Sequence, residues 1–164
     1  MKTLIKITLI LLVSISFLSC SEDTAIEQET VSTENVVIPN DKQVEIEILE
    51  EINTYRISKG LSSLSKLNII KSQTFSHTNH MVESNKISHD NFPSRSAFLK
   101  ERTGAKKVGE NVAVGFQTAE SIVRGWVNSE GHRKNLEGSY THFDISAEQN
   151  ENGTWFYTNI FVKK

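Results

Sequence analysis

Two stretches decide how this chain folds: residues 109–113, GENVA, and residues 126–136, WVNSEGHRKNL. The first is a short apolar run that carries a carboxylate, Glu110. Between the two stretches, a helix is expected from Thr118, which can cap it, to Gly131, which can end it. His132 follows directly after that glycine. The segment therefore predicts a strand or extended turn, then a helix, and then a histidine at a helix break that starts another turn of helix over residues 132–137. Glu110 and His132 could line one cleft together with His89.

Upstream of this stretch the chain reads as helical. A first helix is expected after Asn40 or Asp41, because apolar residues recur there at spacings of three and four, and Gly60 can end it. A second helix runs from about Lys66 to Asn85. Its expected core face is Leu67, Ile70, Thr74, His77 and Met81. Ser94 can cap a third, short helix that ends at Thr103-Gly104.

The last part of the chain predicts a β-hairpin. Residues 143–149 and 154–162 alternate in hydrophobicity, and Asn150-Glu151-Asn152-Gly153 supplies the turn between them. Both faces of the second strand are largely apolar, which places it in the middle of a sheet with helices on each side. The sequence therefore predicts an α+β fold, in which a small antiparallel sheet lies between layers of helix.

Composition limits the class of protein. The chain has 164 residues, of which 37% are hydrophobic, and a formal net charge of −2. This length allows one domain with a real core once an export segment is removed. No run of Lys or Arg is interleaved with aromatic residues, so a nucleic-acid partner is not expected.

The amino-terminal segment, residues 1–19, predicts an export signal. Lys2 and Lys6 precede a largely apolar run over residues 7–18, which has the length of a signal-peptide core and is short for a membrane span. Phe17-Leu18-Ser19-Cys20 resembles a bacterial lipoprotein signal, in which the cysteine is acylated. The alternative is a plain secretory peptide with an incidental cysteine. The resemblance implies an outer-membrane lipoprotein of the cell envelope, facing the periplasm or exposed at the surface.

Residues 20–40 read as a flexible tether. This segment carries five acidic residues, no basic residue and no apolar periodicity. Residues 41–164 then form the single folded domain. Cys20 is the only cysteine of the chain, so no disulfide can support that domain outside the cytoplasm.

Candidate chemistry rests on His89, Glu110 and His132. The sequence lacks G-x-S-x-G, H-E-x-x-H, P-loop and Cys-x-x-Cys patterns. Two imidazoles and a carboxylate can hold Zn²⁺ or act as acid–base groups on a bound water. Each residue also has a structural alternative: an exposed loop for His89, a backbone-capping or paired carboxylate for Glu110, and a helix end for His132.

Other polar residues have simpler explanations. His77 and His80 stand three apart on the second helix and could share a metal, but His77 falls on the core face and reads as a buried, hydrogen-bonded histidine. Arg133 is expected to pair with a carboxylate, and His142 to begin the first strand of the hairpin. Trp126 is expected in the core.

Taken in order, these motifs resemble the bacterial branch of the CAP superfamily, which comprises cysteine-rich secretory, antigen 5 and pathogenesis-related 1 proteins. The resemblance covers residues 44–162 and rests on Ser88-His89, on GENVA and on WVNSEGHR. It implies a three-layer α-β-α sandwich. It also implies a cleft with two histidines and two acidic residues, which in some members bind Zn²⁺ or another divalent ion.

Carried over residue by residue, the resemblance places His89, Glu110 and His132 in that cleft, and tentatively gives a metal to the two histidines. The second acid does not carry over directly. The family position falls on Ser129, and Glu130 beside it is the substitute candidate.

Two functions follow as expectations from the family. One is an extracytoplasmic binding module, most simply a monomer, that holds a small apolar, glycan, protein or other cell-envelope ligand, with or without a divalent metal. The other is a metal-assisted hydrolase of the peptidase type, in which His89 and His132 hold the ion and Glu110 activates water. The catalytic residue is otherwise unknown, and Glu110 is the candidate.

Overall fold

The computed structural model describes residues 36–164. The predicted signal peptide, Cys20 and most of the predicted tether therefore lie outside the described residues. The helices are α1 (Gln43–Ser58), α2 (Asn68–Ser84), α3 (Phe92–Thr103), α4 (Ala119–Asn128) and α5 (Glu130–Leu136), and the strands are β1 (Ser65–Lys66), β2 (Lys107–Val114), β3 (His142–Gln149) and β4 (Trp155–Lys163).

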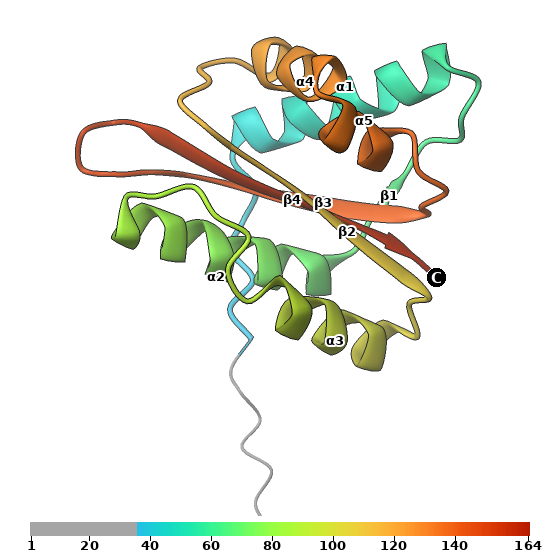
Figure 1. The fold of residues 1–164 in the computed structure, drawn as a ribbon, viewed down its shortest axis with the longest axis horizontal. Coiled ribbons are helices and arrows are strands. Elements are labelled where there is room, and N and C mark those ends of the chain that lie inside the picture. The colour runs from blue at the N-terminus through green and yellow to red at the C-terminus, as the bar shows by residue number, and fades with distance from the viewer. Residues whose placement is uncertain (1–35) are drawn as a thin grey trace, which may run out of the picture. The chain divides into compact units, whose positions relative to one another are not determined.

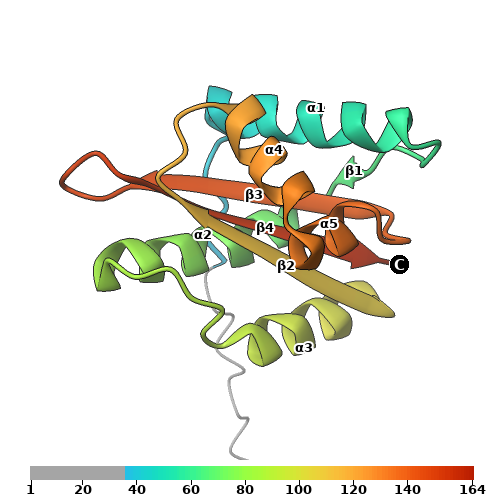
Figure 2. The same cartoon turned by 45° about the horizontal axis from the view of Figure 1, so that its top comes forward.

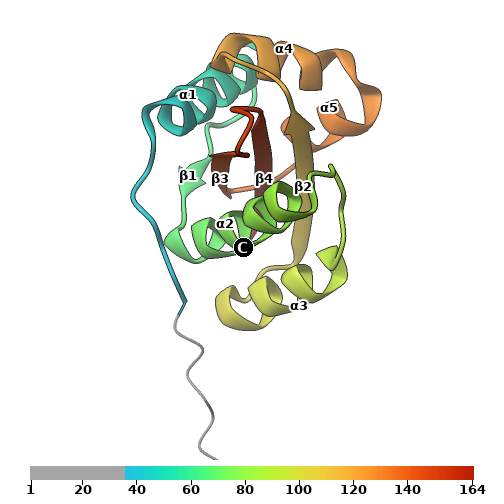
Figure 3. The same ribbon diagram turned by 90° about the vertical axis from the view of Figure 1, so that its left-hand side faces the viewer.

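The strands form one sheet in the order β1-β3-β4-β2, which puts β4 next to both long neighbours. Helices α1, α4 and α5 cover one face, and α2 and α3 cover the other (Figure 1). The same two layers remain on either side of the sheet when the molecule is turned (Figures 2 and 3). The predicted α+β sandwich with a central last strand is confirmed.

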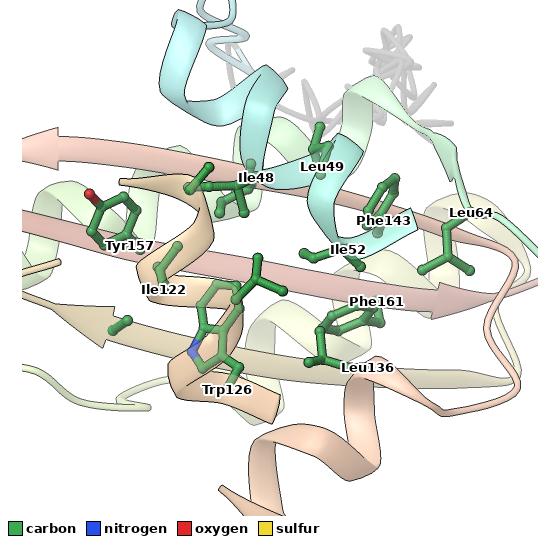
Figure 4. Close-up of a cluster of buried hydrophobic side chains, with 14 of the residues drawn as sticks. Ile48, Leu49, Ile52, Leu64, Ile122, Trp126, Leu136, Phe143, Tyr157 and Phe161 are labelled. Carbon is green, nitrogen blue, oxygen red and sulfur yellow. The ribbon is translucent and has the colours of Figure 1, made fainter. Parts of the chain in front are cut away.

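The largest cluster of buried hydrophobic side chains lies between the sheet and the α1/α4 layer. Ile48 and Ile52 of α1 meet Trp126 of α4 and Phe161 of β4 there (Figure 4). A second cluster on the opposite face joins α2 and α3 to β4 through residues such as Ile70 and Leu99. Each face of β4 is thus buried, as its apolar residues on both sides predict.

Strand β2 is an edge strand, and helical side chains bond to its outer carbonyls. The Trp126 indole N–H donates to the Val112 carbonyl at 3.2 Å, and the Asn135 amide donates to the Glu110 carbonyl at 3.0 Å. An edge strand with unpaired backbone groups can recruit another strand. These two bonds occupy that edge and fix α4 and α5 beside β2.

The main difference from the sequence prediction lies between α4 and α5. The helix that begins at Thr118 ends at Asn128, and Ser129 is extended (φ −97°, ψ 118°) between the two helices. Gly131 therefore does not end a helix, because it lies in the first turn of α5 with negative φ. The further turn of helix expected over residues 132–137 is confirmed, but it begins two residues earlier, at Glu130. The prediction of a stop at Gly131 failed because glycine is the commonest helix stop, whereas here an extended serine breaks the helix.

Two smaller differences concern helix and strand starts. Helix α3 begins at Phe92 rather than after Ser94, because Asn91 takes the left-handed conformation before it and Pro93 fits the first turn. Strand β1 was not predicted. It has only two residues, Ser65 and Lys66, paired in parallel with β3, and is too short to show a period.

A buried carboxylate on β3 gives a pH-dependent prediction. Asp144 is fully buried, and burial raises its pKa to about 6. Its ordinary value is about 3.9, so between roughly pH 4 and 6 the unfolded chain is ionised while the folded chain keeps its proton. The free energy of unfolding should therefore fall as the pH rises through this window, by up to about 3 kcal/mol.

Asp144→Asn removes this ionisation and keeps the acceptor that takes the Ile145 N–H at 2.9 Å. We expect the variant to match the wild type at pH 4 and to exceed it in unfolding free energy at pH 7. Urea denaturation at pH 4, 5, 6 and 7 measures the difference. An equal difference at pH 4 and pH 7 would show that Asp144 does not cause the pH dependence.

Candidate functional site

Glu110 lies on β2 with its side chain 1% exposed, and Arg95 of α3 neutralises it. The Arg95 Nε donates to Oε2 at 2.9 Å, and Nη2 donates to Oε1 at 3.0 Å. This is the two-pronged geometry in which guanidinium and carboxylate bond most strongly. A carboxylate in this apolar segment is expected to be paired, hydrogen-bonded or in a water-filled cleft, and the structure shows the first two. The sequence did not identify Arg95 as the partner.

His89 lies in the loop between α2 and α3, and its Nδ1 is 2.8 Å from Oε1 of Glu110. A carboxylate accepts hydrogen bonds, so Nδ1 carries the proton in this contact. The side chain of His89 is 53% exposed. Its Nε2 has no hydrogen-bond partner between residues 36 and 164, which leaves this nitrogen available to a ligand.

The backbone on both sides of His89 is held in place. His77 of α2 bonds through Nε2 to the Ser88 carbonyl at 2.8 Å, and Nη1 of Arg95 donates to the Asp90 carbonyl at 2.6 Å. Burial lowers the pKa of His77, so it stays neutral and donates from Nε2. His77 is thus the buried, hydrogen-bonded histidine that the sequence favoured, and it positions His89.

His132 approaches the same place from α5. Burial lowers the pKa of His132, and the charge of His89 lowers it further. The His132 carbonyl accepts a bond from the Asn111 amide at 3.1 Å. His89, Glu110 and His132 therefore gather around β2, although they come from a loop, a strand and a helix.

The three residues Gly109, Glu110 and Asn111 have separate roles. Glu110 faces Arg95 and His89, and Asn111 faces α5. Gly109 allows close packing, because a Cβ there would lie 2.4 Å from the Tyr140 hydroxyl and 2.7 Å from Oδ1 of Asn135. The strand thus contacts His89 on one side and carries α5, with His132, on the other.

Glu130 is not brought to this group in the structure. Its side chain is 74% exposed, and it pairs with Lys134 at 2.8 Å, one helical turn away. Arg133 also differs from expectation, because it donates to the Val127 carbonyl at 2.7 Å and pairs with no carboxylate among the described residues. The helix break at Ser129 explains both placements, since it changes the direction of every side chain that follows.

The remaining histidines have separate contacts. His80 lies 3.7 Å from Asp90, and its ring is stacked on that of His77 with centroids 6.0 Å apart. Because the Nε2 of His77 is bonded to Ser88, the two rings do not present a shared pair of free nitrogens. His142 begins β3, as predicted, and lies beside the Thr141 hydroxyl.

A groove of about 400 Å³ lies between α2 and α3, next to this group. Its lining residues are Gln73, Ser76, His77, His80, Asn91, Ser94, Arg95 and Phe98. Arg95 belongs both to the groove and to the Glu110 pair. His77 lines the groove while it bonds the Ser88 carbonyl, whereas His89 itself is not a lining residue. Phe98 gives the groove an apolar wall beside its polar lining.

The residues of the site fit a divalent metal only in part. His89 and His132 offer two imidazoles, but both oxygens of Glu110 are already bonded, to Arg95 and to His89. Between residues 36 and 164, no three His, Cys, Asp or Glu side chains are grouped to hold an ion. A zinc site with three protein ligands therefore does not fit this arrangement.

The family CAP, described as the cysteine-rich secretory protein family, matches residues 49–162, which include every residue of this site. The chain belongs to this family. Two proteins of Bacillus subtilis (strain 168) are similar to this CAP chain. The uncharacterized membrane protein YlbC is 32% identical over 126 residues, covering 73% of this chain and 34% of YlbC. The uncharacterized protein YkwD is 31% identical over 124 residues, covering 73% of this chain and 47% of YkwD.

Solved structures agree with the fold. An extracellular SCP-domain protein from Bacillus anthracis is 28% identical with a TM-score of 0.63, covering 73% of this chain and 40% of that chain. An outer surface protein from Borrelia burgdorferi shares the fold at 18% identity and a TM-score of 0.67, covering 76% of this chain and 96% of its own. This CAP chain thus spans about a third to a half of the curated relatives' length.

One relative is named as a membrane protein and another as an extracellular protein, which indicates an extracellular or envelope location for this CAP chain. Among the helices that the structure describes, none combines the length and the apolar character that crossing a membrane requires.

Proposed function

We propose that this CAP domain is a binding module of the cell envelope, held to a membrane by acylated Cys20, and that it takes a small ligand at His89 and His132. The observation that carries the proposal is the anchored imidazole of His89. Glu110 holds its Nδ1 at 2.8 Å, and its Nε2 has no partner in the described part of the chain. Because Nδ1 carries the proton given to Glu110, the lone pair of Nε2 can accept a hydrogen bond from a ligand hydroxyl. A carboxylate head is held only when Nε2 is protonated as well, so that the imidazole donates to both carboxylates.

The groove between α2 and α3 supports a ligand with an apolar body. It starts at Arg95 and passes Phe98, and a second groove of about 570 Å³ continues it along α2 past Phe75. A ligand with a polar head at His89 would lie along this path. This arrangement resembles small-molecule sites in general, where a few polar groups orient a largely apolar ligand.

The hydrolase alternative gains no support from Glu110. A general base must accept a proton from water, but the carboxylate of Glu110 is 1% exposed and bonded on both oxygens. Its contacts suit a residue that positions His89. A divalent ion remains part of the binding proposal only as a ligand of the two imidazoles, with its other positions open to the bound molecule or water.

Calorimetry with dodecanoate, which has a carboxylate head on an apolar chain, tests this function. We expect binding to the wild type and a roughly 10-fold or greater loss in His89→Ala, because a hydrogen bond to a charged group contributes about 1.5–3 kcal/mol. His132→Ala should also weaken binding. His142→Ala is the control and should bind as the wild type does, since His142 contacts Thr141 instead.

Equal affinity in all four proteins would contradict the binding site. Zn²⁺ titrated into the same proteins tests the metal separately: uptake that is lost in both His89→Ala and His132→Ala places the ion at the imidazoles. Uptake that neither substitution changes removes the metal from the proposal and leaves the dodecanoate result unaffected.

A further inference from the structure

A second surface lies at the end of the sheet where β2 begins and β4 ends. Four lysines gather there, which we call the lysine end: Lys106, Lys107, Lys163 and Lys164. Lys107 and Lys163 are direct partners in the antiparallel ladder, and the Lys106 N–H donates to the Lys163 carbonyl at 2.8 Å. Figures 1 and 2 show the end of β4 beside the start of β2. The pairing of β2 with β4 brings Lys106 and Lys107 next to Lys163 and Lys164, which lie far from them in the sequence.

The position of these like-charged lysines lowers the stability of the fold. Like charges directly opposite each other on neighbouring strands destabilise a sheet, and Lys107 faces Lys163 in this way. None of the four forms an ion pair with a carboxylate between residues 36 and 164. By contrast, ion pairs are present at Lys42, Lys66, Lys71, Arg95, Arg124 and Lys134.

One contact at the lysine end accommodates a charge without neutralising it. The Nζ of Lys107 lies 4.6 Å from the centre of the Tyr140 ring, over a face that attracts cations. Lys106, Lys107 and Lys164 are exposed, and Lys163 is half-buried. Where a chain keeps an unfavourable charge arrangement at its surface, the compensation is expected from a partner.

We propose that the lysine end docks on a membrane surface rich in anionic lipids. This goes beyond the proposed function, because it uses none of the ligand-binding residues. The partner follows from the type of charge. Lysine is depleted in protein–protein interfaces, which rely on aromatic and Arg anchors, and here no large apolar side chain is exposed among the four. Flexible ammonium groups suit a fluid layer of headgroup phosphates.

The predicted anchor makes such a contact effective. If residues 20–40 form the flexible tether that the sequence predicts, about 20 residues would span roughly 25 Å, and the anchored domain would stay close to the bilayer, where the charged contact is strengthened further. The tether carries five acidic residues and no basic one. It is repelled by an anionic surface, which leaves the lysine end to make the contact.

The test uses the chain from Ser21 to Lys164, which keeps all described helices, strands and core clusters but cannot be lipidated. Vesicles of equal parts phosphatidylglycerol and phosphatidylcholine are compared with pure phosphatidylcholine vesicles by co-sedimentation. We expect binding to the anionic vesicles alone, and weaker binding as salt approaches about 0.15 M. The variant with all four lysines changed to Gln should lose at least about 10-fold in affinity.

The matched control changes four exposed cations elsewhere to Gln: Lys59, Lys86, Arg124 and Lys134. Both variants then have the same net charge. The control should lose much less affinity, and the lysine-end variant should unfold at no lower urea concentration than the wild type, because it removes a like-charge pair.

Equal losses in the two variants would overturn the proposal in favour of a net-charge effect. Absence of wild-type binding to the anionic vesicles would also overturn it. If heparin binds through the four lysines while the anionic vesicles do not, the partner is a polyanionic glycan instead of a membrane.

Discussion

Replacing Arg95 with Met should lower the free energy of unfolding by about 3–5 kcal/mol, because it leaves the buried carboxylate of Glu110 without its cation. Arg95 provides two of the hydrogen bonds to that carboxylate, and its own side chain is 8% exposed. Within residues 36–164, His89 is then the only side chain bonded to Glu110, and it lies largely at the surface. Urea denaturation at pH 7 measures the loss.

The matched control is Arg124→Met. Arg124 also pairs with a glutamate, Glu120, at 2.8 Å, but both side chains are more than half exposed. Surface pairs of this kind contribute at most about 1 kcal/mol. Similar losses in Arg95→Met and Arg124→Met would show that burial does not strengthen the Arg95 pair.

A double substitution separates the pair from the packing. Arg95→Met with Glu110→Gln removes both charges, so the double variant should be less destabilised than the sum of the two single variants. The expected coupling is about 1–3 kcal/mol. Additive losses would mean that Arg95 stabilises the fold through its stem alone and does not hold Glu110 in place for His89.

Local sequence patterns predicted those helices and strands whose signals lie within the element itself. The helix over Gln43–Ser58 shows a clear apolar period, Thr118 caps α4 through the Ser121 N–H, and the hairpin has both alternation and turn residues. Each of these signals acts within a few residues. A sequence can therefore place them without any knowledge of what packs against them.

The site was predictable only in part for the same reason. An acid among apolar residues predicts that Glu110 needs a partner. The partner, Arg95, lies 15 residues earlier on helix α3, and only the packing of α3 against β2 brings the two together. The role of His77 also depends on a tertiary contact, the bond to the Ser88 carbonyl.

The break between α4 and α5 shows a different limit. Ser129 and Gly131 are both plausible ends for a helix, and glycine is the stronger local signal. The extended conformation of Ser129 is tied to the packing of α5 on β2, where Asn135 bonds the Glu110 carbonyl and Asn111 bonds the His132 carbonyl. The predicted break at Gly131 and the observed break at Ser129 differ by two residues, and this difference decides which side chains of α5 face the site.

Replacing Lys71 with Met should lower the free energy of unfolding by about 3–5 kcal/mol. Lys71 belongs to a second buried ion pair, separate from the one at Glu110, and the substitution removes its cation. Lys71 of α2 is 2% exposed, and its Nζ lies 2.6 Å from Oε2 of Glu45, which is fully buried. The ammonium also donates to the Ile145 carbonyl at 2.8 Å. Without Lys71, Glu45 keeps a buried charge that two backbone amides bond and that the half-exposed Lys42 ammonium approaches only to 3.9 Å.

Those amides explain why the fold places a charge there at all. Glu45 accepts the Ala147 N–H at 2.8 Å and the Lys42 N–H at 2.7 Å, so one carboxylate joins the start of α1 to β3. Lys71 connects α2, which belongs to the other helical layer, to the same carboxylate and to β3. The pair thus connects both helical layers to the same strand, and its loss should loosen all three elements together.

Lys66→Met is the matched control, since Lys66 pairs with Asp41 in the same region but is 42% exposed. Its loss should be below about 1 kcal/mol. Amide hydrogen exchange followed with the urea curves would show whether Lys71→Met increases exchange at the Ala147 N–H and in the first turn of α1. Unchanged exchange there, or equal losses in the two lysine variants, would contradict a structural role for the buried pair.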